Sequence, residues 1–566
     1  MGAPGCREAE AKAALESVEA EEHERMTYLF AFITALVISM AIIPLMVRLA
    51  PRLGMIDRPD PRKVHTTPIP RVGGVGIVLG ALVPIAMWLS LDALSGAYLF
   101  GALVLLVFGV WDDVCELGHY VKFIGQFIAV MAVVYYGDLY VTHLPFMGLE
   151  PIPESIGRPF TVFAMMGMIN AINHSDGLDG LAGGISLLSL SSMGYLAFLV
   201  DGSMLIIIAL ATMGGIFGFL RYNTHPAKVF MGDGGSQFLG FTLGFLAVFL
   251  IEKVNPVLSP ALPALMLGLP VADILAVFAQ RAYQGMNWFR ATKNHIHHRL
   301  LELGFDHYEA VVIKYSIQTL FVVSAIFLGY ESDLLILAIY LGVCSLIFIF
   351  LTAAEHKNWR AHGSGRESRL ARAIRAVKGH DLFSMAPARF VAIAVPSLFL
   401  LVIFWADKVP RDFGVVSAVL AAILLVYLVF NGRKDSIVRQ TVIYTTAAFV
   451  VYLETKFIGK DTLLLNAVEV IYFVAVAAAI GLAIRYAREK QFRTTPTDYL
   501  VVFIVLFAGF LLHNTPDKAD IGIMAVKLII VFYGCELVIT RLQDRWNVLN
   551  LSALASLVVL AVRGLV

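Results

Sequence analysis

Charged side chains are scarce in this sequence, since Asp, Glu, Lys and Arg together make up 15% of its 566 residues. A soluble domain needs a larger polar share to cover its surface, so this composition excludes an ordinary soluble protein. The formal net charge is only +1, which gives no electrostatic reason to expect a nucleic-acid partner. The four cysteines are scattered and form neither a metal or redox pair nor a disulfide framework.

The sequence also lacks the alternating apolar and polar pattern of a membrane β-barrel. What it has instead are long apolar runs, such as Thr27–Val47 and Phe390–Trp405, and a mean hydropathy of +0.79. A helix needs roughly 20 apolar residues to cross a bilayer, and it satisfies its own backbone hydrogen bonds there. These runs therefore predict an all-α, polytopic membrane protein.

Hydropathy predicts about eighteen transmembrane helices, about eleven in a first membrane region and about seven in a second. We expect them near residues 27–47, 72–91, 97–111, 121–137, 159–174, 181–200, 203–220, 236–252, 259–280, 311–330, 332–353, 388–405, 413–431, 440–458, 462–484, 498–513, 520–540 and 546–563.

Composition divides the chain into four parts. Residues 1–25 form a polar, acidic leader that lacks the basic-then-apolar order of a signal peptide, and Met26 directly before the first apolar run is the expected native start. Residues 26–353 form the first membrane region, 354–387 a basic linker, and 388–566 a C-terminal membrane module. The linker resembles an amphipathic surface helix in its Arg-rich stretch.

Lys and Arg gather in alternate loops between the predicted helices. The basic loops lie near residues 48–71, 221–228, 281–299, 360–378, 433–439 and 485–493. The positive-inside rule places these loops in the cytoplasm and both chain ends outside. The expected protein therefore crosses its membrane many times, with the basic loops facing the cytoplasm.

Five dense polar clusters precede residue 300, and each falls in a loop or helix end assigned to the cytoplasm. A transporter more typically carries its ionisable residues near the bilayer midplane. This placement favours an enzyme that works at one membrane face. The clusters are residues 57–74, 111–113, 170–180, 223–235 and 295–299.

The first two clusters suit phosphate chemistry. Lys63 and His65 lie in a proline-rich basic loop that could meet phosphates, although a plain positive-inside loop looks the same. Asp112 and Asp113 repel each other unless a cation or a proton lies between them, and a carboxylate there suits a proton acceptor. Lys122 follows nine residues after Asp113 and could counter that charge; a solvated helix end is the alternative.

The third cluster contains the strongest signal. Asn170, Asn173, Asp176 and Asp179 recur at every third position, which lines one face of a helix or turn. Such polar side chains at the end of an apolar helix are costly without a polar ligand. Gly177 within the cluster lets a ligand approach the backbone.

The last two clusters add candidate ligands. Asp233 stands between glycines and suits a hard oxygen ligand for Mg²⁺, Phe230 could stack on a base, and a plain turn is the alternative. The segment from His295 through His297 and His298 to Arg299 could bind a diphosphate or a sugar. A zinc site is disfavoured there because neither a cysteine nor a helical His-x₃-His spacing is present.

At these clusters the sequence resembles the polyprenyl-phosphate N-acetylhexosamine-1-phosphate transferases, in glycosyltransferase family 4. The stretches that carry the resemblance follow the family's order over roughly residues 27–353. They are Arg62-Lys63-x-His65 with Gly73-Gly74, Asp112-Asp113, Asn170 to Gly180, Ala227 to Gly234, and His295 to Arg299.

The resemblance implies a reaction in which a sugar-1-phosphate passes from a UDP-N-acetylhexosamine to undecaprenyl or another polyprenyl phosphate in the bilayer, releasing UMP. It implies that Mg²⁺ (or Mn²⁺) is the cofactor. The sequence leaves open whether the protein acts as a single chain or as a homodimer. The implied roles are Asp112, Asp113 and Lys122 at the lipid phosphate, Asn173 and Asp233 at the metal, Asp176, Gly177, Asp179 and Phe230 around the uridine, and His297, His298 and Arg299 at the diphosphate and sugar.

The interrupted order of histidines in the fifth cluster resembles the undecaprenyl-phosphate α-N-acetylglucosaminyl 1-phosphate transferase branch rather than the muramoyl-pentapeptide branch. UDP-GlcNAc is therefore the expected donor, with other UDP-N-acetylhexosamines or UDP-MurNAc-pentapeptide as alternatives. The C-terminal module departs from the family and carries charges in or near its spans: Glu454, Glu469, Lys527 and Glu536. A lipid-linked-sugar transporter is the competing class, and interhelical pairing is the plainer explanation of those charges.

Overall fold

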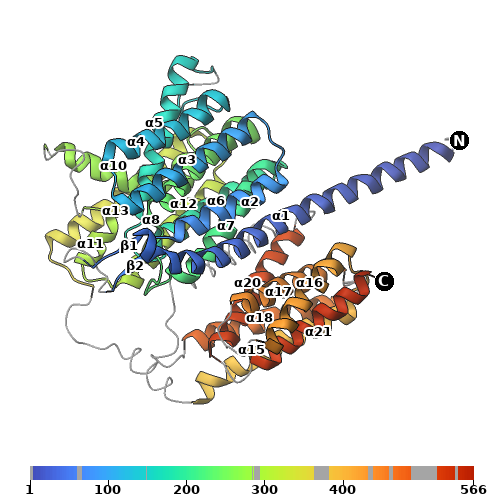
Figure 1. The fold of residues 1–566 in the computed structure, drawn as a ribbon. Coiled ribbons are helices and arrows are strands. Elements are labelled where there is room, and N and C mark those ends of the chain that lie inside the picture. Colours follow the sequence, from blue (N-terminus) through green and yellow to red (C-terminus); the bar gives the residue numbers. More distant parts are fainter. Residues whose placement is uncertain are drawn as a thin grey trace. The chain divides into compact units, whose positions relative to one another are not determined.

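The computed structural model describes residues 4–59, 67–147, 150–283, 285, 294–361, 381–430, 437–457, 463–485, 519–541 and 546–565. The chain divides into two compact units, Met1–Gly363 and Ser364–Val566. Each unit is a helical bundle, seen in Figure 1 with the first unit coloured blue to yellow and the second orange to red. The division falls inside the basic segment 354–387.

Almost all regular structure is helical. The first unit contains α1 (Pro4–Leu53), α2 (Gly73–Trp88), α3 (Ala93–Cys115), α4 (His119–Met131), η1 (Ala132–Tyr136), α5 (Glu154–Ser175), α6 (Leu181–Phe198), α7 (Ser203–Asn223), α8 (Gly232–Phe249), η2 (Leu250–Val254), α9 (Pro263–Met266), α10 (Gly268–Tyr283), α11 (Ile296–Glu302), α12 (His307–Phe327) and α13 (Asp333–His356). The second contains α15 (Asp381–Trp405), α16 (Arg411–Phe430), α17 (Ile437–Phe457), α18 (Leu463–Arg485), α20 (Ala519–Arg541) and α21 (Trp546–Leu565).

Within the described residues, twelve helices are long and apolar enough to cross a membrane. This confirms the predicted all-α, polytopic class, whereas the total of about eighteen spans stays a prediction. Helices also occupy five further predicted spans, as α2, α5, α10, α17 and α20, which are not among the twelve. The predicted span at 498–513 lies outside the described residues.

Two local features depart from the predicted series of uninterrupted helices. The single span expected at 259–280 is interrupted, because α9 ends at Met266 and α10 begins at Gly268. Gly268 lies against the ring of Phe321, where an added Cβ would come within 2.6 Å of that ring. The other feature is a two-stranded antiparallel sheet, β1 (Ile56–Asp57) with β2 (Ile69–Pro70), placed after α1.

Helix α8 is the centre of the first unit. Its apolar window is completely buried, and it packs against α2, α3 and α5. Glycines allow these backbones to meet: a Cβ on Gly74 would lie 2.2 Å from the backbone nitrogen of Gly235, and one on Gly109 would lie 2.2 Å from the Cα of Gly234. The small residues around Asp233 therefore bring the start of α8 directly against α2 and α3.

Candidate active site

A lysine bridges two carboxylates where three helices meet. Lys122 Nζ on α4 lies 2.7 Å from Asp112 Oδ2 near the end of α3 and 2.7 Å from Asp233 Oδ2 at the start of α8. The Asp112 side chain is 7% exposed, whereas those of Lys122 and Asp233 are 28% and 24% exposed. The ammonium offsets one of the two carboxylate charges, so the ionised trio stays negative overall, and two of its three groups remain accessible to a ligand.

The neighbouring carboxylate, Asp113, has a different partner. Its Oδ1 accepts a hydrogen bond of 3.1 Å from the backbone N–H of Asp233, in the first turn of α8. A helix N-terminus favours a negative group at this place. Gly232 has a φ of 74°, and a Cβ there would lie 2.5 Å from Asp113 Oδ2. Glycine is thus required at 232 both by its backbone conformation and by the close approach of Asp113.

Asn173 joins the cluster from the last turns of α5. Its Nδ2 donates to Asp233 Oδ1 at 3.2 Å and to Ser236 Oγ at 2.9 Å. The two residues expected to hold a metal, Asn173 and Asp233, are therefore in contact, although they are sixty residues apart in the sequence.

The donor set fits Mg²⁺ in its chemistry. Mg²⁺ prefers oxygen ligands and retains several water molecules. The carboxylates of Asp112, Asp113 and Asp233 come together in this cluster and offer such oxygens. A half-turn of the Asn173 amide would present its oxygen instead of its nitrogen. The Lys122 ammonium already shows that the space between Asp112 and Asp233 accepts positive charge.

The segment after α5 turns sharply beside this cluster. Gly180 has a φ of 80°; its N–H donates to Asn223 Oδ1 at 2.7 Å, and its carbonyl accepts from the Tyr315 hydroxyl at 2.6 Å. Desolvation of the partly buried Asp176 carboxyl, together with the charges of Asp233 and Asp179, raises its pKa to about 7. At neutral pH, the protonated and ionised forms of this carboxyl are therefore present in similar amounts.

The predicted histidine cluster packs behind that turn. His297, on the short helix α11, is only 2% exposed, and a Cβ on Gly177 would lie 2.4 Å from its Nε2. Burial and the positive charge of Lys314 lower the pKa of His297 to about 2, so the ring is neutral at physiological pH. This burial favours a supporting role for His297 over the direct substrate contact that the sequence predicts.

Other members of the fifth cluster are also engaged. Arg299 binds both carboxylate oxygens of Glu355 on α13, at 2.6 and 2.8 Å. The rings of His297 and His298 lie 4.1 Å apart, and His295 stacks at 5.3 Å on His174, a residue that the sequence reading passed over. The structure brings these histidines together beside the third cluster, while Arg299 points to α13.

The first cluster reaches the site through its glycines. Phe230 pairs with the strand end, since its N–H donates to Pro70 O at 2.8 Å and its carbonyl accepts from Gly73 at 2.9 Å. Arg71 forms an ion pair with Asp57 across the small sheet. Lys63 and His65, which the sequence predicts to meet phosphate, lie outside the described residues.

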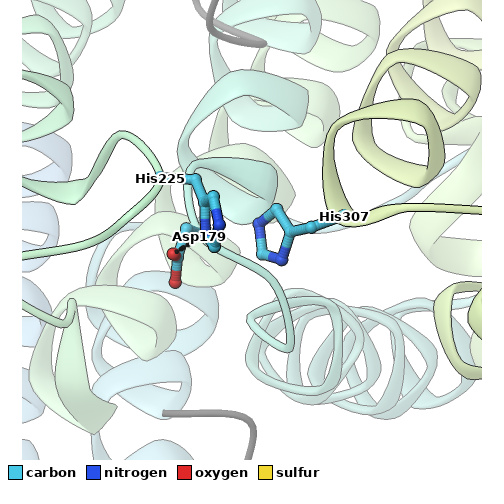
Figure 2. A group of neighbouring side chains, drawn as sticks. All are labelled: Asp179, His225 and His307. Carbon is cyan, nitrogen blue, oxygen red and sulfur yellow. Dashed lines mark hydrogen bonds and ion pairs between the residues drawn. The ribbon is translucent and has the colours of Figure 1, made fainter. Parts of the chain in front are cut away.

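Asp179 has partners that sequence spacing did not reveal. Figure 2 shows it beside His225 and His307, which come from the segment after α7 and the start of α12. Its Oδ2 lies 2.6 Å from His225 Nδ1 and accepts from the Ala227 N–H at 3.1 Å. The carboxylate that was expected at the uridine therefore already links two turns, from the third and fourth clusters.

One ligand atom from each of Asp179, His225 and His307 lies within 4.8 Å of the other two, which makes the group a candidate metal site. The two imidazole rings, however, stack with centroids 4.1 Å apart and planes 22° apart. A bound ion lies close to the plane of each ligating ring at about 2.0–2.1 Å, and nearly parallel stacked rings do not direct their nitrogens to one such point. The arrangement favours a hydrogen-bonded link between segments.

Sequence reasoning assigned no role to Ser236, His174, His225 and His307, nor to the amides Gln126, Asn223 and Gln237, although His174, Asn223 and His225 lie inside the third and fourth clusters. Helical spacing from a predicted residue would have found Gln126 and Gln237, because each follows a predicted site residue by four positions. His225 and His307 had no such signal, since only the fold brings them to Asp179.

Comparison with known proteins agrees with this geometry. A family model described as glycosyl transferase family 4 matches residues 95–251, the stretch that contains every member of the lysine and carboxylate cluster. The chain is 35% identical over 326 residues to the probable undecaprenyl-phosphate N-acetylglucosaminyl 1-phosphate transferase of Bacillus subtilis, which covers 57% of this chain and 90% of that protein.

Two further relatives agree. The undecaprenyl-phosphate α-N-acetylglucosaminyl 1-phosphate transferase of Haemophilus influenzae is 30% identical over 344 residues, covering 59% of this chain and 94% of that protein. The decaprenyl-phosphate N-acetylglucosaminephosphotransferase of Mycobacterium tuberculosis is 30% identical over 298 residues, covering 47% of this chain and 74% of that protein. The matches cover the core and leave the C-terminal extension unmatched. From the clustered site and these matches, the chain belongs to glycosyl transferase family 4.

Proposed function

We propose that the first unit transfers N-acetylglucosamine-1-phosphate from UDP-GlcNAc to undecaprenyl phosphate or a related polyprenyl phosphate in the bilayer. An oxygen of the lipid phosphate attacks the sugar-bearing phosphorus of UDP-GlcNAc. The bridging P–O bond breaks, UMP leaves, and a lipid-linked diphosphate sugar remains. The names of the relatives support the transferred N-acetylglucosamine-1-phosphate group and this class of acceptor.

The observation that carries the proposal is Lys122 between Asp112 and Asp233, with Asn173 on the far side of Asp233. Phosphoryl transfer depends mainly on alignment and on neutralisation of charge. The Lys122 ammonium can move away from the two carboxylates and bind the lipid phosphate. Asp112 or Asp113 can then accept a proton from that phosphate or hold it in position.

Asn173 and Asp233 would hold Mg²⁺, with Mn²⁺ as the alternative, and nearby carboxylates would assist. A divalent ion at this position supplies charge stabilisation to the pyrophosphate of the donor. The protein's own part is to keep the start of α8 against α3, so that Asp113, Asp233 and Asn173 remain within hydrogen-bond distance.

The nucleotide side of the site would lie at the turn 176–180. Gly177 leaves the backbone open, Asp176 is partly exposed, and Phe230 is half-buried on the neighbouring segment. His298 is half-buried, whereas His297 is buried, so His298 is the histidine of this pair that would meet the diphosphate or sugar. Asp179 would hold the turn in shape through His225.

We also propose that the enzyme lies in the bacterial inner membrane with this site at the cytoplasmic face. The distribution of Lys and Arg between alternate loops supports that orientation. The nucleotide donor would then be taken from the cytoplasm while the acceptor stays in the bilayer.

The test is an assay of the purified full chain with UDP-GlcNAc, undecaprenyl phosphate and Mg²⁺, measuring UMP release and the lipid product. A donor panel with UDP-GalNAc and UDP-MurNAc-pentapeptide identifies the sugar. We expect UDP-GlcNAc to be preferred. UMP release from none of these donors by a folded, monodisperse protein would refute the proposed reaction.

A further inference from the structure

A second polar layer lies one helical turn deeper than the candidate site. Gln126 follows Lys122 by four positions on α4, and Gln237 follows Asp233 by four on α8. Asn170 precedes Asn173 by three on α5. Residues three or four apart share a helix face. Each of the three helices therefore carries an amide behind its own site residue.

The three amides form a continuous chain across the helices. Asn170 Nδ2 donates to Gln126 Oε1 at 2.9 Å, and Gln126 Nε2 donates to Gln237 Oε1 at 3.2 Å. Asn170 Nδ2 also donates to the Met166 carbonyl at 2.8 Å, so both of its amide hydrogens are used. Gln126 and Gln237 are each only 2% exposed. These bonds use the amide nitrogen of Asn170 within the layer.

We propose that Gln126, Asn170 and Gln237 are positioning residues that set the rotation of α4, α5 and α8 and thereby the distances among Lys122, Asn173 and Asp233. Apolar helix surfaces in a bilayer pack by shape and tolerate small rotations, whereas a buried amide that loses its partner is costly. A rotation of α4 that moves Lys122 away from Asp233 also breaks the bond between Gln126 and Gln237. The amide layer thus restrains the site through the helices that carry it.

General stabilisation of the bundle is the alternative, and the chain offers a matched control. The hydroxyls of Tyr98 on α3 and Thr242 on α8 form a buried hydrogen bond of 3.0 Å. This bond also joins two helices that carry site residues. Tyr98, however, lies fourteen positions before Asp112, which is about 21 Å along a helix. Tyr98→Phe removes a buried hydrogen bond without touching the layer beneath the site.

The experiment, which rests on the proposed transferase reaction, compares Gln126→Met, Gln237→Met and Tyr98→Phe in the full chain. We expect kcat of each glutamine variant to fall about 10- to 100-fold, because small misalignments of reacting groups are costly in rate. KM for UDP-GlcNAc should stay within about threefold, since Gln126 and Gln237 are each only 2% exposed and act through the helices that carry them. Tyr98→Phe should lower the melting temperature by about as much as the glutamine variants do. Its kcat should nevertheless stay within about twofold of wild type.

The double variant Gln126→Met/Gln237→Met provides the second readout. Because the two side chains bond to each other, its loss of kcat should be close to that of one single variant rather than to their product. Glutamine variants that fold and keep kcat, losses that multiply, or an equal loss in Tyr98→Phe would overturn the proposal. If Gln126→Met does not fold, Gln126→Asn keeps the amide but shortens its reach, and the same criteria apply. An inactive wild-type chain would instead reject the proposed reaction.

Discussion

Each unit of this protein contains a lysine between two carboxylates, and the two arrangements differ in access. In the first unit Lys122 lies between Asp112 and Asp233 and is 28% exposed. In the second unit Lys527 on α20 lies 2.6 Å from Glu454 on α17 and also pairs with Glu469 on α18, while being only 5% exposed. The charge patterns are alike, but only the first is open to a ligand.

The surroundings differ as well. The Lys122 cluster lies at helix ends, where Asp233 begins α8 and Asn173 contributes an amide. The Lys527 cluster lies within three helices, and the Lys527 ammonium is also 5.2 Å from the centre of the Phe473 ring. We infer that this buried ion cluster holds α17, α18 and α20 in their pairing. Paired charges in a membrane helix therefore identify a candidate site only when access and additional oxygen or amide ligands accompany them.

The largest effect should come from breaking the open cluster. Asp233→Ala removes the carboxylate that contacts both Lys122 and Asn173, so we expect kcat to fall by at least about 1000-fold. The variant should remain monodisperse in detergent, because Asp112 still neutralises Lys122. UMP release at near wild-type rates would remove Asp233 from the reaction.

Removal of divalent ions tests the same cluster without a mutation. In excess EDTA we expect UMP release to stop and to return on addition of Mg²⁺, because the carboxylate and amide set suits a hard cation. The control is the melting temperature of the protein in EDTA, which should change little. Full turnover in EDTA would contradict the proposed metal.

The closed cluster should respond in stability rather than in chemistry. Lys527→Met leaves Glu454 and Glu469 without their ammonium partner, and breaking a buried ion pair costs about 3–5 kcal/mol. We expect a lower melting temperature for the full chain, with an unchanged rate of UMP release per folded molecule. A large loss of turnover in a folded Lys527→Met protein would make the second unit part of the active site.

A smaller effect is expected from His297→Gln. The folded pKa of His297 is lowered to about 2, whereas an unfolded histidine titrates near 6.5. The unfolded chain therefore binds the extra proton, and folding stability falls as pH drops below about 6.5, by at most about 1.4 kcal/mol per pH unit. Replacing His297 should weaken this acid sensitivity, measured as the difference in melting temperature between pH 7.5 and pH 5.5. An identical difference in the variant would show that His297 is not the titrating group.

The smallest effect is expected from separating the units. Truncation after about residue 385 removes the second bundle except for the start of α15 and keeps all five polar clusters, so UMP release should stay within about threefold of the full chain. Monodispersity in detergent and binding of UDP-GlcNAc serve as folding controls. A truncated protein that passes both controls yet releases no UMP would show that the two regions act together.

By itself the sequence determined the membrane class, most helix positions, and the residue types of the site. Long apolar runs leave few alternatives to a helix in lipid, and Asp112, Asn173 and Asp233 stand at helix ends where polar groups need partners. Residues 388–566 received spans but no role, because nothing in their sequence matched a motif.

Only the tertiary structure decided which groups meet. Lys122 was expected near the aspartates in sequence, but its second contact, Asp233, lies 111 residues away. The structure also turned Asp179 toward His225, buried His297, and placed Asn170 in an amide chain with Gln126 and Gln237. Spacing along one helix reports a shared face, whereas partners on other helices depend on rotation and close packing, which here rest on glycines such as Gly74, Gly109 and Gly235.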